Sequence, residues 1–132
     1  MSKKRWIYFI GTHGNRFVKI GMSRDPLTRL RELQSGSPYP LSLLATLYVP
    51  DFPRVAERAL HQHFVFDWVH GEWFRGSRSL IETIVRVRDG GFDWRELEMP
   101  TDEQWGRSWQ DVLRVLRRDV REQFRFVDKE MA

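Results

Sequence analysis

The chain has 132 residues, and its hydrophobic fraction of 41% with 14% aromatics supplies the core of one domain and excludes a disordered chain. It has no cysteine, which excludes disulfides and thiolate zinc sites and predicts a reducing, cytoplasmic location. The apolar run at 6–10 is too short for a signal-peptide core, and no stretch approaches the roughly 20 apolar residues of a membrane span, so we expect a soluble protein without membrane contact.

Positive charge is concentrated in the first quarter of the chain. The formal net charge is only +4, but residues 1–31 hold eight lysines and arginines against one acidic residue, Asp25. Such a segment attracts polyanions such as nucleic acid. A surface that merely keeps the protein in solution would have the same composition, so composition alone leaves both interpretations open.

The first predicted elements form a β-hairpin and a helix. Residues 6–11 and 16–22 are rich in aromatic and β-branched side chains, and the turn-forming residues 12–15 separate them. Asp25 followed by Pro26 is typical of a helix start, and leucines at a spacing of three predict a helix over about 26–35.

A third strand and two further helices follow. Residues 43–49 are a continuous apolar run of strand length, a helix is expected from 51–53 to about 64, and another over 79–87. The segment 71–74 between these helices is expected to be a loop or short bridge. The prediction is therefore a small α/β domain of the α+β type over residues 1–90, with an antiparallel three-stranded sheet in the order β-β-α-β-α-α.

Residues 91–132 are predicted as a C-terminal helical extension. Thr101 and Gln104 have the spacing of a capping box, and apolar residues then recur on one stripe of a long amphipathic helix. Its outer face mixes arginines with acids, which favours a solvated surface over a nucleic-acid contact. We expect the stripe on 101–132 to serve a protein partner or self-association.

The hairpin predicts one reactive pair. If the turn is 12–15, Gly11 lies opposite Arg16 and Tyr8 lies opposite Lys19, so that phenol and ammonium share one face of the sheet. A neighbouring positive charge lowers the pKa of a tyrosine, and such a pair can act as a general base. The alternative is an unreactive strand tyrosine beside a surface lysine, and a one-residue slip of register would separate the two.

Three features resemble the GIY-YIG nuclease superfamily: Tyr8 within the sequence WIYFIG, the tripeptide KIG at 19–21, and Arg29 eight residues later. The segments 56–61 and 71–74 are similar to a phage and bacterial branch in which the second tripeptide reads KIG. The resemblance covers about residues 6–88. It implies a hairpin that bears both tripeptides, a first helix with a catalytic arginine and a later helix with a glutamate.

The activity implied by this resemblance is metal-dependent hydrolysis of phosphodiester bonds, with DNA as the expected substrate. Tyr8 takes the place of the first motif's tyrosine, Arg29 that of the catalytic arginine, and Glu57 that of a glutamate that binds Mg²⁺ or Mn²⁺. Lys19 stands where the second motif usually has tyrosine, and we interpret it as assisting Tyr8. Trp6 replaces the first glycine of the family pattern.

Other candidates come from spacing and charge. His61 lies one helical turn after Glu57, where a hydrogen bond or a proton transfer near the metal is feasible, so it joins the catalytic candidates. Simpler roles stay open, because Arg29 can pair with Glu32 and Glu57 with His61 on their own helices. The expected nucleic-acid contacts are Lys3, Lys4, Arg5, His13, Arg16, Arg24 and Arg31.

Two rival functions accompany the nuclease hypothesis. The same fold with an altered second tripeptide suits a nucleic-acid-binding module with weak or no hydrolysis. A protein-interaction scaffold that docks its partner through 101–132 is the third alternative.

Overall fold

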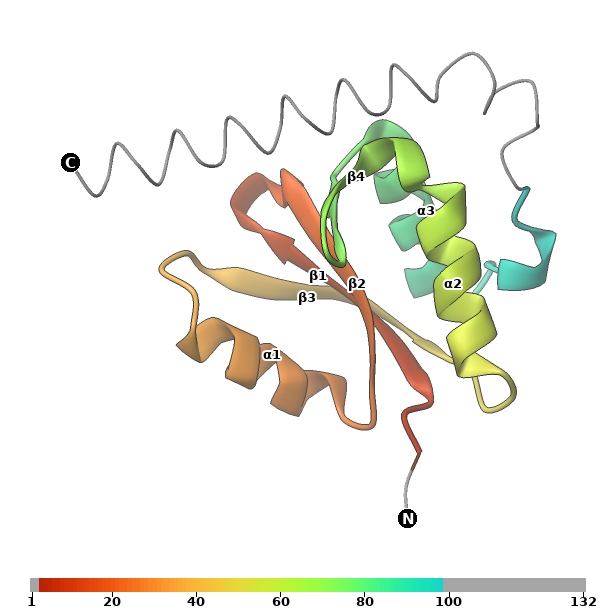
Figure 1. Ribbon diagram of the computed structural model, residues 1–132, viewed down its shortest axis with the longest axis horizontal. Coiled ribbons are helices and arrows are strands. Elements are labelled where there is room, and N and C mark those ends of the chain that lie inside the picture. The colour runs from red at the N-terminus through yellow and green to blue at the C-terminus, as the bar shows by residue number, and fades with distance from the viewer. Residues whose placement is uncertain (1–2, 99–132) are drawn as a thin grey trace.

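The computed structural model describes residues 3–98, which form one antiparallel sheet with helices on both faces (Figure 1). The strands are β1 (Trp6–Thr12), β2 (Phe17–Ser23), β3 (Leu41–Tyr48), β4 (Trp68–His70) and β5 (Trp73–Arg75), in the spatial order β3-β1-β2-β5-β4. The helices are α1 (Pro26–Ser35), α2 (Pro53–His63) and α3 (Arg78–Arg88).

The α+β class is confirmed, but the predicted three-stranded sheet is wrong because the sheet has five strands. Of the two additional strands, β5 overlaps the segment 71–74 that we expected to be a loop or short bridge, and β4 lies directly before that segment. Each has three residues, which is too short to display the alternation that marks a strand in sequence. β5 pairs with β2 and places Trp73 opposite Lys19, so the second tripeptide lies inside the sheet and not at its edge.

The register of the hairpin differs from the prediction by two residues. Tyr8 lies opposite Gly21, and Lys19 lies opposite Ile10. The reason is the turn: a short 3-10 segment occupies 13–15, Asn15 adopts a left-handed conformation with φ of 57°, and β2 begins one residue later than expected. Because the shift is an even number of residues, Tyr8 and Lys19 still share one face, but as diagonal neighbours.

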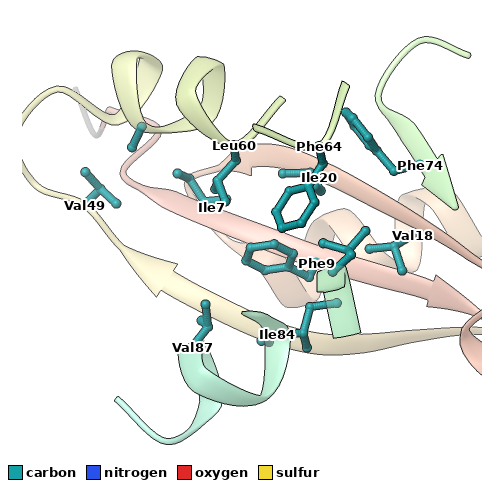
Figure 2. Close-up of a cluster of buried hydrophobic side chains, with 13 residues drawn as sticks. Ile7, Phe9, Val18, Ile20, Val49, Leu60, Phe64, Phe74, Ile84 and Val87 are labelled. Carbon is teal, nitrogen blue, oxygen red and sulfur yellow. The ribbon is translucent and has the colours of Figure 1, made fainter. Parts of the chain in front are cut away.

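The hydrophobic core lies between one face of the sheet and helices α2 and α3 (Figure 2). Alternate residues of β1 and β2 point to this face, which is the period-two pattern of a half-buried sheet. Within residues 3–98 no buried side-chain nitrogen or oxygen lacks a hydrogen-bond partner. The strand and helix residues that fill the core include Ile7, Phe9, Val18, Ile20, Leu60, Phe64, Leu80 and Ile84.

Helix α1 lies on the other face of the sheet, and its predicted span of 26–35 is confirmed. The Asp25 side chain accepts a hydrogen bond from the Thr28 backbone amide, which caps the helix, and Pro26 occupies the first turn. None of its residues is fully buried, and Leu27 is 57% exposed. Helix α1 is therefore only partly embedded, and its first two turns remain accessible from solvent.

The chain beyond α3 continues along the core. Phe92, Trp94 and Leu97 pack against it, and the backbone carbonyl of Glu98 lies 2.6 Å from the Nδ1 atom of His63 in α2. The predicted helix over 101–132, and with it the expected partner or self-association surface, lies outside the described residues. No helix within 3–98 is both long and apolar enough to cross a membrane.

Candidate active site

The first site element is Tyr8, whose phenol lies across the neighbouring strand at Gly21. Tyr8 is 1% exposed, and a β-carbon on Gly21 would overlap the phenol oxygen and approach the Glu72 carboxylate to 3.0 Å. Glycine at the end of the KIG tripeptide thus leaves room for the Tyr8 ring.

Helix α1 places Arg29 at the phenol. The guanidinium of Arg29 and the phenol of Tyr8 form a side-chain hydrogen bond, in which Tyr8 accepts because a guanidinium has only donors. Arg29 also donates from Nη1 to Glu32 Oε2 at 3.0 Å. The helix-surface pairing with Glu32, which the sequence offered as the simpler role, therefore coexists with a contact to Tyr8.

The electrostatic setting of Tyr8 is the reverse of our expectation. Burial raises the pKa of Tyr8, the Arg29 hydrogen bond opposes this rise, and the negative charges of Glu72 and Glu57 add to it. The prediction of a tyrosine with a lowered pKa is therefore wrong. At neutral pH the phenol keeps its proton.

Lys19 contacts an acid instead of the phenol. Its Nζ atom lies 3.4 Å from Glu72 Oε2 and 5.7 Å from the centroid of the Trp73 ring, and its side chain is 14% exposed. The predicted direct pairing of Lys19 with Tyr8 is wrong because of the register shift described above. The lysine instead balances a carboxylate that would raise the pKa of Tyr8.

The acidic side of the site consists of Glu57 and Glu72. Glu57 lies half-buried on α2, and burial raises its pKa, with the Glu72 charge adding to the rise and His61, Arg54 and Lys4 opposing it. Glu72 was not among the metal or catalytic candidates selected from the sequence. Its position became evident only with β5, because the carbonyl of Glu72 accepts the amide of Ile20 at 3.0 Å and continues the β2 ladder.

His61 joins α2 to the same stretch of β2. Its Nε2 atom lies 2.8 Å from the Ile20 carbonyl oxygen, and since a carbonyl can only accept, Nε2 carries the proton. The ring lies 5.1 Å from that of Phe74. His61 therefore anchors the helix one turn after Glu57, and a role in proton transfer stays a prediction.

The carboxylates fit one type of metal ion. No group of three or more His, Cys, Asp or Glu side chains suited to a metal occurs within residues 3–98, so the described chain offers no zinc or calcium cage. Mg²⁺ is instead held by one or two carboxylates, with phosphate oxygens and water completing its shell. Glu57 and Glu72 are the candidates for such a donor pair, and a cation bound there would offset the burial penalty on the Glu57 charge.

The predicted nucleic-acid contacts fall into two groups. Lys3, Lys4 and Arg5 precede β1 and Arg24 follows β2, so these exposed residues lie at the open end of the hairpin, near Tyr8, and the exposed Arg31 lies on α1, which follows this end along the chain. Figure 1 shows the course of these elements. His13 and Arg16 lie in the hairpin turn, and the end of β1 is already roughly 13 Å along the strand from Tyr8. The structure does not bring these two residues to the site.

One further cation was missed from the sequence. Arg54 lies exposed at the start of α2, and its charge lowers the pKa of Glu57. It belongs to a chain segment in which acids outnumber bases, so charge counting gave no reason to select it.

The comparison with protein-family models matches residues 5–89 to the T5orf172 domain. This domain is found in phage and bacterial nuclease-like proteins. No curated protein and no solved structure gives a significant match to the chain. The matched range contains Tyr8, Lys19, Arg29, Glu57, His61 and Glu72, whereas Lys3 and Lys4 lie just before it.

Proposed function

Because the chain belongs to the T5orf172 domain family, we propose that it is a metal-dependent endonuclease of the GIY-YIG type that hydrolyses DNA. One observation carries the proposal. The phenol of Tyr8 and the Glu72 carboxylate meet at Gly21 of β2, and the Arg29 guanidinium and the Glu57 carboxylate are close enough to shift the pKa of that phenol.

Each part of phosphodiester hydrolysis has a candidate among these groups. The reaction needs an oriented water, positive charge for the pentavalent phosphate, and stabilisation of the leaving oxygen. Arg29 presents a guanidinium, whose planar donors suit phosphate oxygens. A divalent cation held by Glu57 and Glu72 would supply Lewis-acid stabilisation of the phosphate and the leaving oxygen.

The state of Tyr8 assigns it an orienting role. With its pKa raised by burial, the phenol is a poor base at neutral pH, so it does not take the proton from water in the resting protein. Its oxygen accepts from Arg29, and its own O–H remains to donate to a water or to a phosphate oxygen. Tyr8 therefore fixes Arg29 and the attacking water in position.

Lys19 acts in this proposal as a positioning residue. Its ammonium group forms an ion pair with the Glu72 carboxylate and also lies against the face of the Trp73 ring. Without the lysine, the Glu72 carboxylate would lose this partner, and its repulsion of the Glu57 charge would be opposed only by His61, Arg54 and Lys4. The change from tyrosine to lysine in the second tripeptide is thus compatible with a working site.

The test is a cleavage assay with the full chain on supercoiled plasmid and on labelled oligonucleotides, with Mg²⁺, Mn²⁺ or EDTA. We expect nicking that needs the divalent ion and disappears in Glu57→Gln. The matched control is Glu82→Gln, because Glu82 is an exposed helix glutamate paired with Arg78 and far from the site in the fold. Cleavage that persists in Glu57→Gln would refute the metal assignment.

The rival function, a binding module without hydrolysis, is separated by a binding measurement. Salt-sensitive DNA binding by the wild-type chain without cleavage under any ion condition would favour the module. Cleavage that is abolished by Glu57→Gln while binding survives would favour the nuclease.

A further inference from the structure

An aromatic pair lies on the sheet face that carries Tyr8. Trp6 and Tyr48 oppose each other across β1 and β3, with ring centroids 4.8 Å apart and ring planes inclined by 48°. Residues two apart on a strand point to the same face, so Trp6 and Tyr8 are neighbours, about 7 Å apart along β1. The pair therefore adjoins the site.

This pair does not belong to the hydrophobic core. The core residues of β1 lie on the opposite face, toward α2 and α3. Tyr48 is 51% exposed, and Trp6 is only partly buried. Trp6 also stands at the position where the GIY-YIG pattern has glycine. This chain therefore has a large aromatic ring close to Tyr8, where the pattern has no side chain.

Positive charge surrounds the pair. Lys4 and Arg5 directly precede Trp6 and are exposed. The carbonyl of Arg5 accepts the Val49 amide at 2.7 Å, so this basic segment runs beside the end of β3 that carries Tyr48. Lys4 is also close enough to Glu57 to lower its pKa. Aromatic rings among cations are the composition of a surface that binds single-stranded nucleic acid, where bases stack and the backbone follows the charges.

We propose that Trp6 and Tyr48 form a stacking platform for an unpaired base next to the phosphate that is cut. The substrate class is then a strand with accessible base faces, such as single-stranded DNA or a nucleotide at a flap or gap, in preference to continuous duplex. In a duplex the neighbouring base pairs cover both faces of each base, and exposing one costs unstacking energy. This inference rests on the proposed nuclease function for the position of the cut.

The test measures binding and cleavage separately. Binding is measured in EDTA, with an oligonucleotide that carries 2-aminopurine, as a single strand and as the matched duplex. Trp6→Val and Tyr48→Thr remove the ring and introduce β-branched side chains, which strands favour, and Trp6→Phe keeps a stacking ring. The control is Tyr39→Thr, because Tyr39 is equally exposed at 54% but lies in the connection between α1 and β3.

Loss of a stacking ring is expected to weaken single-strand binding roughly 5- to 150-fold. We expect this loss of single-strand affinity in Trp6→Val, a loss in the same direction in Tyr48→Thr, and little change in Trp6→Phe. For all three variants, duplex binding should stay close to that of the wild type. Equal losses on single strand and duplex, or no loss on either, would overturn the platform even if cleavage is intact. A selective loss of single-strand binding in a chain that cuts nothing would support the platform and reject the nuclease.

Discussion

The contact between Gly21 and Tyr8 predicts a strong and unusual coupling between two strands. In Gly21→Ala the new methyl group would overlap the phenol, so the Tyr8 ring must leave its buried position or the strands must separate. Overpacking of this kind costs about 1–3 kcal/mol of folding stability. The displaced phenol would also lose its hydrogen bond to Arg29.

The same substitution should be harmless once the ring is gone. Tyr8→Val alone removes most of a buried aromatic side chain and should cost about 2–4 kcal/mol. In that background the new methyl group meets only the flexible end of the Glu72 side chain, 3.0 Å from the β-carbon position, so Gly21→Ala should be neutral or stabilise by up to about 1 kcal/mol, because glycine is a poor strand residue. The coupling between the two substitutions should therefore be about 1–4 kcal/mol.

Urea unfolding of the four proteins, followed by far-UV circular dichroism, measures this coupling. A control pair is Gly36→Ala with Tyr8→Val, since a β-carbon at Gly36 would meet only a backbone oxygen at 3.9 Å. If Gly21→Ala costs the same with and without the Tyr8 ring, the packing argument is wrong.

Three further predictions follow from the charges and the backbone. The raised pKa of Glu57 means that stability falls as pH rises from its ordinary value of 4.5 through the folded value, so Glu57→Gln should be more stable than wild type at pH 7 in EDTA, and Mg²⁺ should stabilise only the wild type in thermal melts. Arg29→Ala should lower kcat by about 100-fold or more with a smaller loss of DNA affinity, and an effect on affinity alone would make Arg29 a phosphate anchor. Phe52 is 70% exposed and left-handed with φ of 58°, so Phe52→Asn should raise the free energy of unfolding by about 1 kcal/mol, and an unchanged or lower midpoint in urea would contradict this origin of strain.

The elements that sequence predicted well are those whose signals are local. The cap at Asp25, the proline after it and the leucine spacing lie within ten residues and fixed the span of α1. The positions of the hairpin strands were also predicted correctly, but their register depended on the conformation of the turn. Asn15 adopts a left-handed backbone conformation there, which asparagine tolerates but which the sequence alone does not predict.

The parts that sequence missed depend on contacts between distant segments. β5 is three residues long and becomes a strand only because β2 offers it a partner. Glu72 and the ion pair with Lys19 follow from that pairing, so no pattern within either segment indicated them. The positions of Tyr8, Arg29 and Glu57 came from the resemblance, and their roles in catalysis stay predictions.

The two departures from the GIY-YIG pattern occupy the same sheet face on either side of Tyr8. Lys19 lies diagonal to it and pairs with Glu72, and Trp6 lies two residues before it and packs against the tilted ring of Tyr48. Neither side chain enters the core, so core packing does not select them. Lys19 pairs with an acid of the site, and Trp6 presents an aromatic ring beside it. In the proposed function both residues shape the surroundings of the Tyr8 phenol and of the bound phosphate. In the proposed site the two departures therefore concern how a strand would be bound, while Arg29, beside Tyr8, is the group that we propose to meet the phosphate.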